Sequence, residues 1–201
     1  MNTTLTKQQT IKISKTLSYL LRHGIKIRGL NMRDDAYVPL SEIMNQPEFC
    51  NITIDDIKYV VNTNDKKRYT LLEENGIFFI KANQGHSSNV GDQITQSKTF
   101  EIIKTPFDKC IHGTDLKSWN LIKNTGLSRM SRQHIHFARS EPSDKSVISG
   151  ARSNSKVLIY IDMQKAMDDG IAFYLSENGV ILTEGINGVL DTKYISNVVI
   201  K

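Results

Sequence analysis

The sequence predicts an α+β protein built from two lobes, and three observations support this fold class. The chain has 201 residues, which is enough for one medium-sized domain or two small ones. In both halves, segments with apolar residues at helical spacing are interleaved with short strand-like runs. A polar stretch with few apolar residues separates the halves. We therefore expect a first lobe at residues 1–83, an inter-lobe linker at 84–99 and a second lobe at 100–201.

The first lobe is predicted to contain a helix, a strand, further helices and a terminal hairpin. The expected elements are a helix capped by Thr6 that runs to about His23 and stops at Gly24, a strand at 37–40, helices capped by Ser41 and by Thr53 with Asp56, and a hairpin at 68–82 turning at Asn75-Gly76. This is the order of a winged-helix module, a shape that binds nucleic acids, although fold alone does not fix function.

The second lobe is predicted to contain short strands and brief helices. The expected elements are strands at 109–113, 134–138 and 156–163, a helix at 115–125 ended by Gly126, a helix near 143–151, a hairpin at 172–185 turning at Asn178-Gly179, and a final strand at 198–200.

Composition excludes several classes of protein. With 39% hydrophobic and 23% charged residues, the chain is neither collagen-like nor wholly disordered. No apolar run approaches the length of a membrane span, and the N-terminal segment lacks the apolar core of a signal peptide. We expect a protein of the cytoplasm, or of the nucleus if the host is eukaryotic. Cys50 and Cys110 form neither a disulfide framework nor a zinc site.

The positive charge is concentrated at the N-terminus. Residues 1–33 contain seven bases and no acid, whereas the remaining residues hold 19 bases against 21 acids. The seven bases are Lys7, Lys12, Lys15, Arg22, Lys26, Arg28 and Arg33. Such a block attracts phosphate on electrostatic grounds. A solvated helix face is the alternative interpretation of a charge run.

The histidines are the strongest chemical signal in the sequence. Three of the five, His23, His86 and His112, stand next to a glycine, which lets the backbone approach a ligand closely. His134 and His136 alternate, so a strand would place both on one face, either as a ligand site or as a polar sheet surface. There is no HExxH or CxxC motif, and no GxGxxG or P-loop, so we expect no metal site and no standard nucleotide fold.

Several blocks of the sequence together match a known family. In chain order they are SKTLSYLLRHG, YVPLSEI, RYTL, IKANQGHS, HGT, GLSRMSRQHIHFA, GARSNSKVLIYID and NGVILTEG. In this order and spacing, from about residue 14 to 190, the chain resembles the RNA 2′-phosphotransferases (tRNA 2′-phosphotransferases).

The resemblance implies a winged-helix RNA lobe followed by an ADP-ribosyltransferase-like lobe that binds NAD⁺ as co-substrate. It also implies a reaction without metal, the removal of an internal 2′-phosphate from RNA, typically at a tRNA splice junction. The phosphate attacks the nicotinamide-bearing ribose of NAD⁺, and the ADP-ribosylated RNA then releases 2′-hydroxyl RNA and ADP-ribose 1″,2″-cyclic phosphate. We expect the protein to act as a monomer.

The resemblance also assigns residues. The catalytic set is Arg22, His23, Arg68 and Arg152, and the NAD⁺ contacts are His112, Gly113, Thr114, Arg129, Arg132, His134 and His136. RNA contacts are expected at Lys15 and Arg28 in the basic block and at Lys81, Gln84, His86 and Ser87. Arginine suits this chemistry because its planar fork binds phosphate through two parallel hydrogen bonds.

Three other functions remain open on sequence alone. An ADP-ribosyltransferase that caps phosphorylated nucleic-acid ends would stop after the first step. A non-catalytic winged-helix binder would use only the basic block, and its binding would be sensitive to salt. A metal-free ribonuclease would cleave the RNA chain without NAD⁺.

Overall fold

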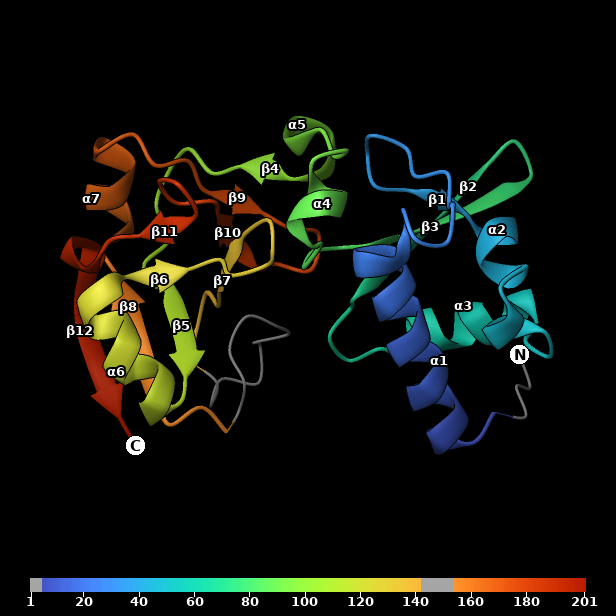
Figure 1. The fold of residues 1–201 in the computed structure, drawn as a ribbon, viewed down its shortest axis with the longest axis horizontal. Coiled ribbons are helices and arrows are strands. Elements are labelled where there is room, and N and C mark those ends of the chain that lie inside the picture. The colour runs from blue at the N-terminus through green and yellow to red at the C-terminus, as the bar shows by residue number, and fades with distance from the viewer. Residues whose placement is uncertain (1–4, 142–153) are drawn as a thin grey trace. The chain divides into compact units, whose positions relative to one another are not determined.

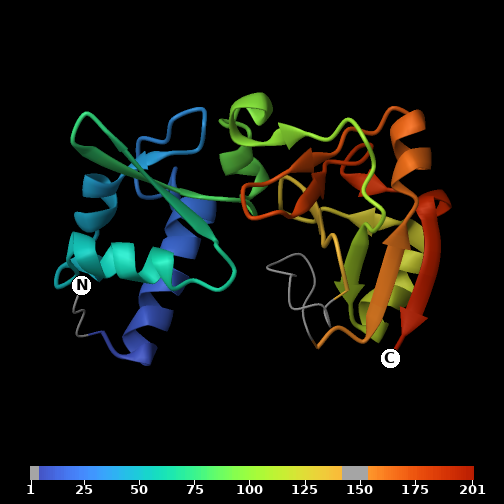
Figure 2. The same ribbon diagram turned by 180° about the vertical axis from the view of Figure 1, so that it is seen from behind.

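The computed structural model describes residues 5–141 and 154–201, and the chain divides into two compact units, Met1–Thr99 and Phe100–Lys201 (Figures 1 and 2). Both units mix helices with antiparallel strands, as the sequence predicts. Among the described residues, no helix is long and apolar enough to cross a membrane. The helix expected near 143–151 lies outside the described residues.

The first unit packs its helices against a small antiparallel sheet. Its elements are α1 (Lys7–Tyr19), a π-helical turn (Leu20–Gly24), β1 (Val38–Pro39), α2 (Leu40–Met44), a 3-10 turn (Pro47–Phe49), α3 (Ile54–Asn62), β2 (Tyr69–Glu74), β3 (Ile77–Ala82), α4 (Ser88–Gly91) and α5 (Gln96–Thr99). The strand order is β1-β3-β2, and the hairpin pairs Tyr69 with Ala82 and Glu74 with Ile77.

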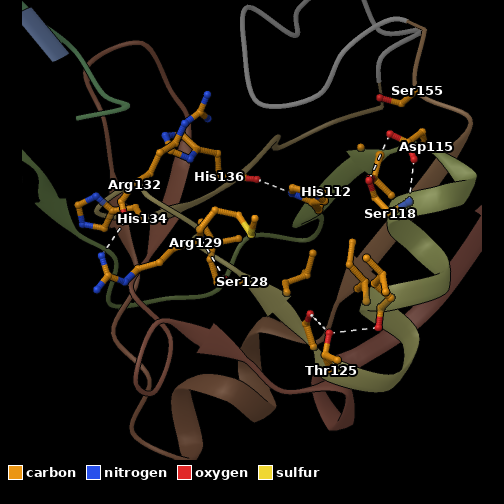
Figure 3. A pocket seen from close by; sticks show the side chains of 18 of the residues that line it. His112, Asp115, Ser118, Thr125, Ser128, Arg129, Arg132, His134, His136 and Ser155 are labelled. Carbon is orange, nitrogen blue, oxygen red and sulfur yellow. Dashed lines mark hydrogen bonds between the residues drawn. The ribbon is translucent and has the colours of Figure 1, made fainter. Parts of the chain in front are cut away.

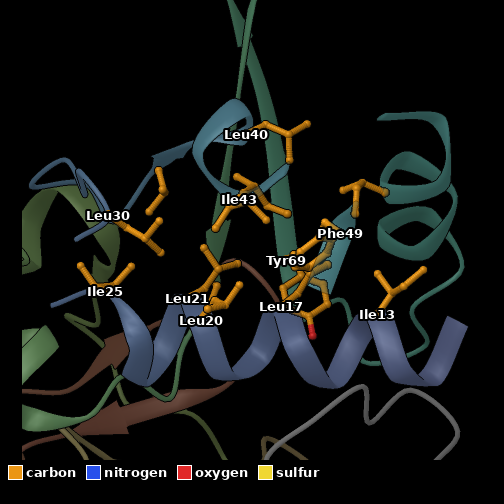
Figure 4. Packing of buried hydrophobic residues seen from close by; sticks show 14 of the residues in the cluster. Ile13, Leu17, Leu20, Leu21, Ile25, Leu30, Leu40, Ile43, Phe49 and Tyr69 are labelled. Carbon is orange, nitrogen blue, oxygen red and sulfur yellow. The ribbon is translucent and has the colours of Figure 1, made fainter. Parts of the chain in front are cut away.

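Helix α1 and the π-helical turn that continues it line the core of this unit with the apolar stripe that the sequence predicts. Ile13, Leu17, Leu20 and Leu21 are all buried and face Ile43 and Tyr69 in one cluster (Figure 4). Thr6 caps the helix in a capping box with Gln9, because each side chain bonds the backbone N–H of the other.

One expected helix end is confirmed, and one expected helix cap is wrong. The π-helical turn that continues α1 ends at Gly24, as expected, and non-helical turns follow it as far as Gly29, which has a φ of 63°. There the N–H of Leu30 donates to the carbonyl of Ile25 at 3.0 Å, which closes a Schellman end. Ser41 does not cap α2, because the helix starts directly from Pro39 at the end of β1.

Residues 84–99, expected to be a linker, form part of the first unit. They contain α4 and α5, and several of their side chains are buried, among them Val90 and Ile94. The N–H of Thr95 donates to the carbonyl of Asp34 at 2.8 Å, and Lys98 pairs with the Asp34 carboxylate at 2.6 Å. This segment is therefore folded against the unit that precedes it.

The second unit consists of short antiparallel strands with two helices among its described residues. Its elements are β4 (Glu101–Ile102), β5 (Ile111–Thr114), α6 (Leu116–Thr125), β6 (Leu127–Ser128), β7 (Ile135–Phe137), β8 (Val157–Ile161), α7 (Met163–Asp168), β9 (Tyr174–Leu175), β10 (Ile181–Thr183), β11 (Val189–Leu190), a 3-10 turn (Thr192–Tyr194) and β12 (Ile195–Ile200).

Two larger sheets, β4-β9-β10-β7 and β12-β8-β5, carry the core of this unit. A bridge between Ile111 and Ala138 connects β5 to the end of β7. Buried side chains from both sheets, including Phe137, Ile159 and Ile181, form one cluster. The bridge places His112 of β5 beside His136 of β7.

Candidate functional site

Arg22 and His23 lie in a widened, π-helical turn, Leu20–Gly24, at the end of α1. Leu20 and Leu21 of this turn are buried, whereas Arg22 is half-buried and His23 is exposed. The ring of His23 lies 6.3 Å from that of Tyr19. Short π-helical insertions occur frequently at functional sites, because they re-aim side chains that a regular helix would place elsewhere.

Residues 85–87, which follow the β2–β3 hairpin, hold the π-helical turn of Arg22 in place. The backbone N–H of Ser87 donates to the carbonyl of Arg22 at 3.0 Å, and the Ser87 hydroxyl donates to the same carbonyl at 3.0 Å. Gly85 has a φ of 90°, and a Cβ built on it would lie 3.3 Å from both Cζ and Nε of Arg22. The guanidinium therefore packs against the bare backbone of Gly85, where a larger residue would displace it.

The same segment fixes Arg68. The N–H of Asn83 donates to the carbonyl of Arg68 at 2.8 Å, and its Nδ2 donates to the carbonyl of Lys67 at 2.8 Å. On its other side, the N–H of Arg68 donates to Oδ1 of Asn64 at 3.1 Å. Residues 83–87, which we call the NQGHS segment, thus hold both predicted phosphate-binding arginines of the first unit.

The remaining predicted RNA contacts differ in their surroundings. Lys15 is exposed on α1, and Gln84 and His86 are buried within the NQGHS segment. Lys81 is only 4% exposed, and its Nζ lies 4.6 Å from the ring centroid of Tyr37, a cation–π contact. The role of these residues in RNA binding stays a prediction.

Part of the basic block is neutralised within the fold. Arg28 pairs with Glu48 at 2.6 Å, and Arg33 pairs with Asp35 at 2.7 Å and with Glu74 at 2.6 Å. These acids come later in the chain, so the charge count of residues 1–33 does not reveal them. Arg28 and Arg33 are therefore structural ion-pair partners, and the phosphate-attracting charge of the block is smaller than the sequence suggests.

The second unit contains a pocket of about 760 Å³. Its wall combines the end of β5, one side of α6, the turn after β6 and the start of β7 (Figure 3). This volume lies within the range of ligand-binding pockets. Asp115 caps α6 by accepting the N–H of Ser118 at 2.7 Å, and both side chains line the pocket.

His112 is held by one hydrogen bond at the pocket wall. Its Nδ1 lies 3.0 Å from the backbone carbonyl of His136 (Figure 3). A carbonyl only accepts, so Nδ1 carries the proton, and Nε2 of the neutral ring is an acceptor. Burial lowers the pKa of His112; the bond to His136 opposes this effect, and the charge of Arg132 adds to it. His112 is therefore neutral at neutral pH.

Arg129 and Arg132 flank a tight turn between β6 and β7. The N–H of Arg132 donates to the carbonyl of Arg129 at 3.1 Å, and Nη1 of Arg129 donates to the carbonyl of Arg132 at 2.7 Å. The N–H of Arg129 also donates to the carbonyl of Gly188 at 2.9 Å. Two guanidiniums on one pocket wall suit an anionic ligand such as a diphosphate.

His134 is buried at the inner wall of the pocket, with 2% exposure. Its ring packs edge-on against Phe100, with ring centroids 5.2 Å apart, and lies 6.1 Å from the ring of Tyr174. Burial lowers the pKa of His134 from 6.5 to about 4, and the charge of Arg129 acts in the same direction. His134 is therefore neutral throughout the physiological range.

This lowered pKa predicts a pH-dependent stability. The unfolded chain binds a proton at His134 near pH 6.5, whereas the folded chain does so only near pH 4. The free energy of unfolding should therefore fall as the pH drops through this window, by about 3 kcal/mol for this group. Urea unfolding at several pH values checks this, and His134→Gln should flatten the slope. Identical slopes in both proteins would contradict the assignment.

The structure brings together all the residues predicted to bind the dinucleotide. The residues that line this one pocket include His112, Gly113, Thr114, Arg129, Arg132, His134 and His136. It also adds lining residues that the sequence did not single out, such as Ser118, Leu121, Met130 and Ser155. Met130 stands inside the GLSRMSRQHIHFA block, where it is an apolar residue in a polar turn. Arg152, the fourth predicted catalytic residue, lies outside the described residues.

Comparison with known proteins matches residues 8–185 to the family described as RNA 2′-phosphotransferase, Tpt1 / KptA family. The chain is 41% identical to tRNA 2′-phosphotransferase 1 of Danio rerio, over 94% of this chain and 85% of the relative. It is 39% identical to the human protein of that name, over 94% and 75%. A relative from Schizosaccharomyces pombe is 44% identical over 96% of this chain, which spans about half (52%) of that relative.

Proposed function

Because this chain belongs to the RNA 2′-phosphotransferase (Tpt1 / KptA) family, we propose that it removes an internal 2′-phosphate from RNA with NAD⁺ as co-substrate. The single observation that carries the proposal is the pocket of the second unit. The residues expected to contact the dinucleotide come from two separate stretches of sequence, 112–114 and 129–136, and all of them line that pocket. A tRNA is the proposed RNA, because relatives over most of this chain are named tRNA 2′-phosphotransferases.

We propose that the first unit is the winged-helix RNA module. The order of α1, β1, α2, α3 and the β2–β3 hairpin supports this assignment. Arg22 and Arg68 would bind the 2′-phosphate, because guanidinium forks match its oxygens. The NQGHS segment would set their positions through the backbone contacts of Asn83, Gly85 and Ser87.

The second unit is the proposed ADP-ribosyltransferase-like module. Arg129 and Arg132 would bind the diphosphate of the dinucleotide. Gly113 would offer its backbone to the nicotinamide amide, and His112 would supply a neutral acceptor nitrogen beside it. Orientation and electrostatic stabilisation, rather than a protein nucleophile, would account for the rate.

The proposed reaction has two steps. A 2′-phosphate oxygen bonds to the ribose carbon that carries nicotinamide, and nicotinamide leaves with the electrons of the broken carbon–nitrogen bond. The neighbouring ribose 2″-hydroxyl then attacks phosphorus, the bond from phosphorus to the RNA 2′-oxygen breaks, and the hydroxyl proton ends on the RNA. The exposed His23 is the proposed proton carrier, since histidine exchanges protons near neutral pH.

An RNA with one internal 2′-phosphate tests this proposal. With NAD⁺ present, mass spectrometry should find 2′-hydroxyl RNA and ADP-ribose cyclic phosphate. ADP-ribosylated RNA that persists without cyclic phosphate would instead indicate an enzyme that caps phosphorylated ends. Unchanged RNA from the folded protein would contradict the proposal.

Gly85→Ala tests the proposed placement of Arg22. The added methyl would lie 3.3 Å from the guanidinium carbon, at a backbone φ of 90° that alanine rarely adopts. We expect unfolding to become easier by about 1–2 kcal/mol and phosphate removal to slow by about tenfold, because a small misplacement of a catalytic group is costly. Single-turnover rates and urea unfolding measure both effects.

Gly29→Ala is the matched control. It also places alanine at positive φ, 63°, but nothing lies within 4 Å of its Cβ. It should reduce stability by a similar amount and leave the rate unchanged. Equal loss of rate in the two variants would show that Gly85 acts only through stability.

A further inference from the structure

The hydrogen bonds of Arg68 differ in kind from those of Arg28 and Arg33 in the same unit. Arg28 and Arg33 bind carboxylates, which neutralise their charge. Arg68 binds the side chain of Asn64 instead: its backbone N–H donates to Oδ1 at 3.1 Å, and its Nη1 donates to the same oxygen at 3.4 Å. Among the described residues, Arg68 forms no ion pair with a carboxylate. A neutral amide therefore holds this guanidinium and leaves its positive charge intact.

A chain of hydrogen bonds fixes which way the Asn64 amide points. The hydroxyl of Tyr69, which packs beside α1 (Figure 4), donates its one proton to the backbone carbonyl of Ser14. The Ser14 hydroxyl, 3.1 Å from the Tyr69 oxygen, therefore donates to that oxygen. Ser14 Oγ in turn accepts Nδ2 of Asn64 at 3.4 Å. Because the amide nitrogen faces Ser14, the amide oxygen faces Arg68.

The same tyrosine connects Arg68 to the helix that leads to Arg22. Tyr69 follows Arg68 directly in the chain. Its hydroxyl oxygen lies 2.6 Å from that of Ser18, which also belongs to α1. Helix α1 continues into the π-helical turn that carries Arg22. These bonds therefore join the two segments that bear the predicted phosphate-binding arginines, and a phosphate held by two guanidiniums requires a fixed spacing between them.

We propose that Asn64 is a positioning residue for the 2′-phosphate, which orients Arg68 without neutralising it. This inference rests on the proposed function. A guanidinium has five N–H donors, and Asn64 accepts one of them, so the others can meet the phosphate oxygens. A carboxylate in the same place would hold the guanidinium equally well, but its negative charge would oppose the binding of a phosphate. Asparagine is therefore required here for phosphate recognition rather than for folding.

Asn64→Asp tests this proposal, because aspartate has the same shape and keeps the acceptor oxygen but adds a negative charge. Dissociation constants are measured without NAD⁺ for an RNA with one internal 2′-phosphate and for the same RNA with a 2′-hydroxyl. The preference for the phosphorylated RNA should fall about tenfold, the scale of one weakened hydrogen bond to a charged group. Urea unfolding should stay close to that of the wild type.

Ser14→Ala tests the orientation of the amide with Asn64 left in place. Alanine favours the helix, so the variant should fold, but the amide nitrogen loses its acceptor. The preference for the phosphorylated RNA should fall about threefold, the scale of one neutral hydrogen bond.

Asn62→Asp is the matched control. Asn62 is exposed at the end of α3 and, within the described part of the chain, bonds neither Asn64 nor Arg68. Its added charge acts on both RNAs alike, so the preference should not change.

A merely structural role for Asn64 predicts the wild-type preference in Asn64→Asp, and this result would overturn the inference. If that variant does not fold, the wild-type preference in Ser14→Ala would overturn it. A wild-type protein that does not prefer the 2′-phosphorylated RNA would instead refute the proposed function, so the two failures are distinguishable.

Discussion

Arg22→Lys is expected to slow removal of the 2′-phosphate by about 10²–10³-fold, a loss typical of a donor that stabilises transition-state charge. Lysine keeps the charge but cannot form the two parallel hydrogen bonds of a guanidinium to a phosphate. Ser87 fixes the backbone of Arg22, and the flat guanidinium packs on Gly85. A lysine ammonium at this position therefore cannot move freely to replace the lost hydrogen bonds. Single-turnover assays with saturating NAD⁺ measure this loss.

Arg33→Lys provides the control for this variant. Arg33 lies in the same unit, but its guanidinium is bound to Asp35 and Glu74. Its replacement should leave the rate within about twofold, since exposed ion pairs contribute little. Circular dichroism should show both variants folded. A rate for Arg22→Lys close to that of Arg33→Lys would remove Arg22 from the proposed phosphate site.

Gly126→Ala is expected to reduce stability more than any other change discussed for the second unit. Gly126 ends α6 with a φ of 81°, and a Cβ there would lie 2.5 Å from the backbone carbonyl oxygen of Leu190. Because that oxygen belongs to β11, which pairs with β6, the methyl would push these strands apart beside the pocket wall. We expect a loss of about 3–5 kcal/mol, the range of severe overpacking and strain combined.

Gly170→Ala separates the clash from the backbone effect. Gly170 has a φ of 86°, but nothing lies within 4 Å of its Cβ. Its replacement should cost only about 1–2 kcal/mol, the cost of a left-handed alanine. Urea unfolding of both variants gives the difference. Equal losses would show that the close approach of Gly126 to Leu190 contributes nothing.

The local rules of helix and turn formation predicted most of the elements. Thr6 and Thr53 cap their helices as expected, and Gly126 ends the helix that it was expected to end. Gly24 likewise ends the π-helical turn that continues α1, but the left-handed backbone comes only at Gly29, after further turns. Nothing in the residues before Gly24 predicts those turns.

The NQGHS segment shows why part of the candidate site could not be predicted from local sequence. Low apolar content indicates a linker, but here the backbone folds back and bonds Arg22 and Arg68. The bonds to Arg22 join residues 65 positions apart in the chain, so no local pattern reports them. The same reason hid Glu48 and Glu74, which pair with Arg28 and Arg33. Apart from the position of His86 beside a glycine, only the family resemblance predicted a function for this segment.

The requirement for NAD⁺ tests the proposed function most directly. The protein is incubated with an RNA that carries one internal 2′-phosphate, with and without NAD⁺, and both nicotinamide and 2′-hydroxyl RNA are quantified. We predict no phosphate removal without NAD⁺ and, with it, one nicotinamide released for each RNA converted. Phosphate removal that proceeds equally without NAD⁺, or nicotinamide release without any converted RNA, would contradict the proposed function.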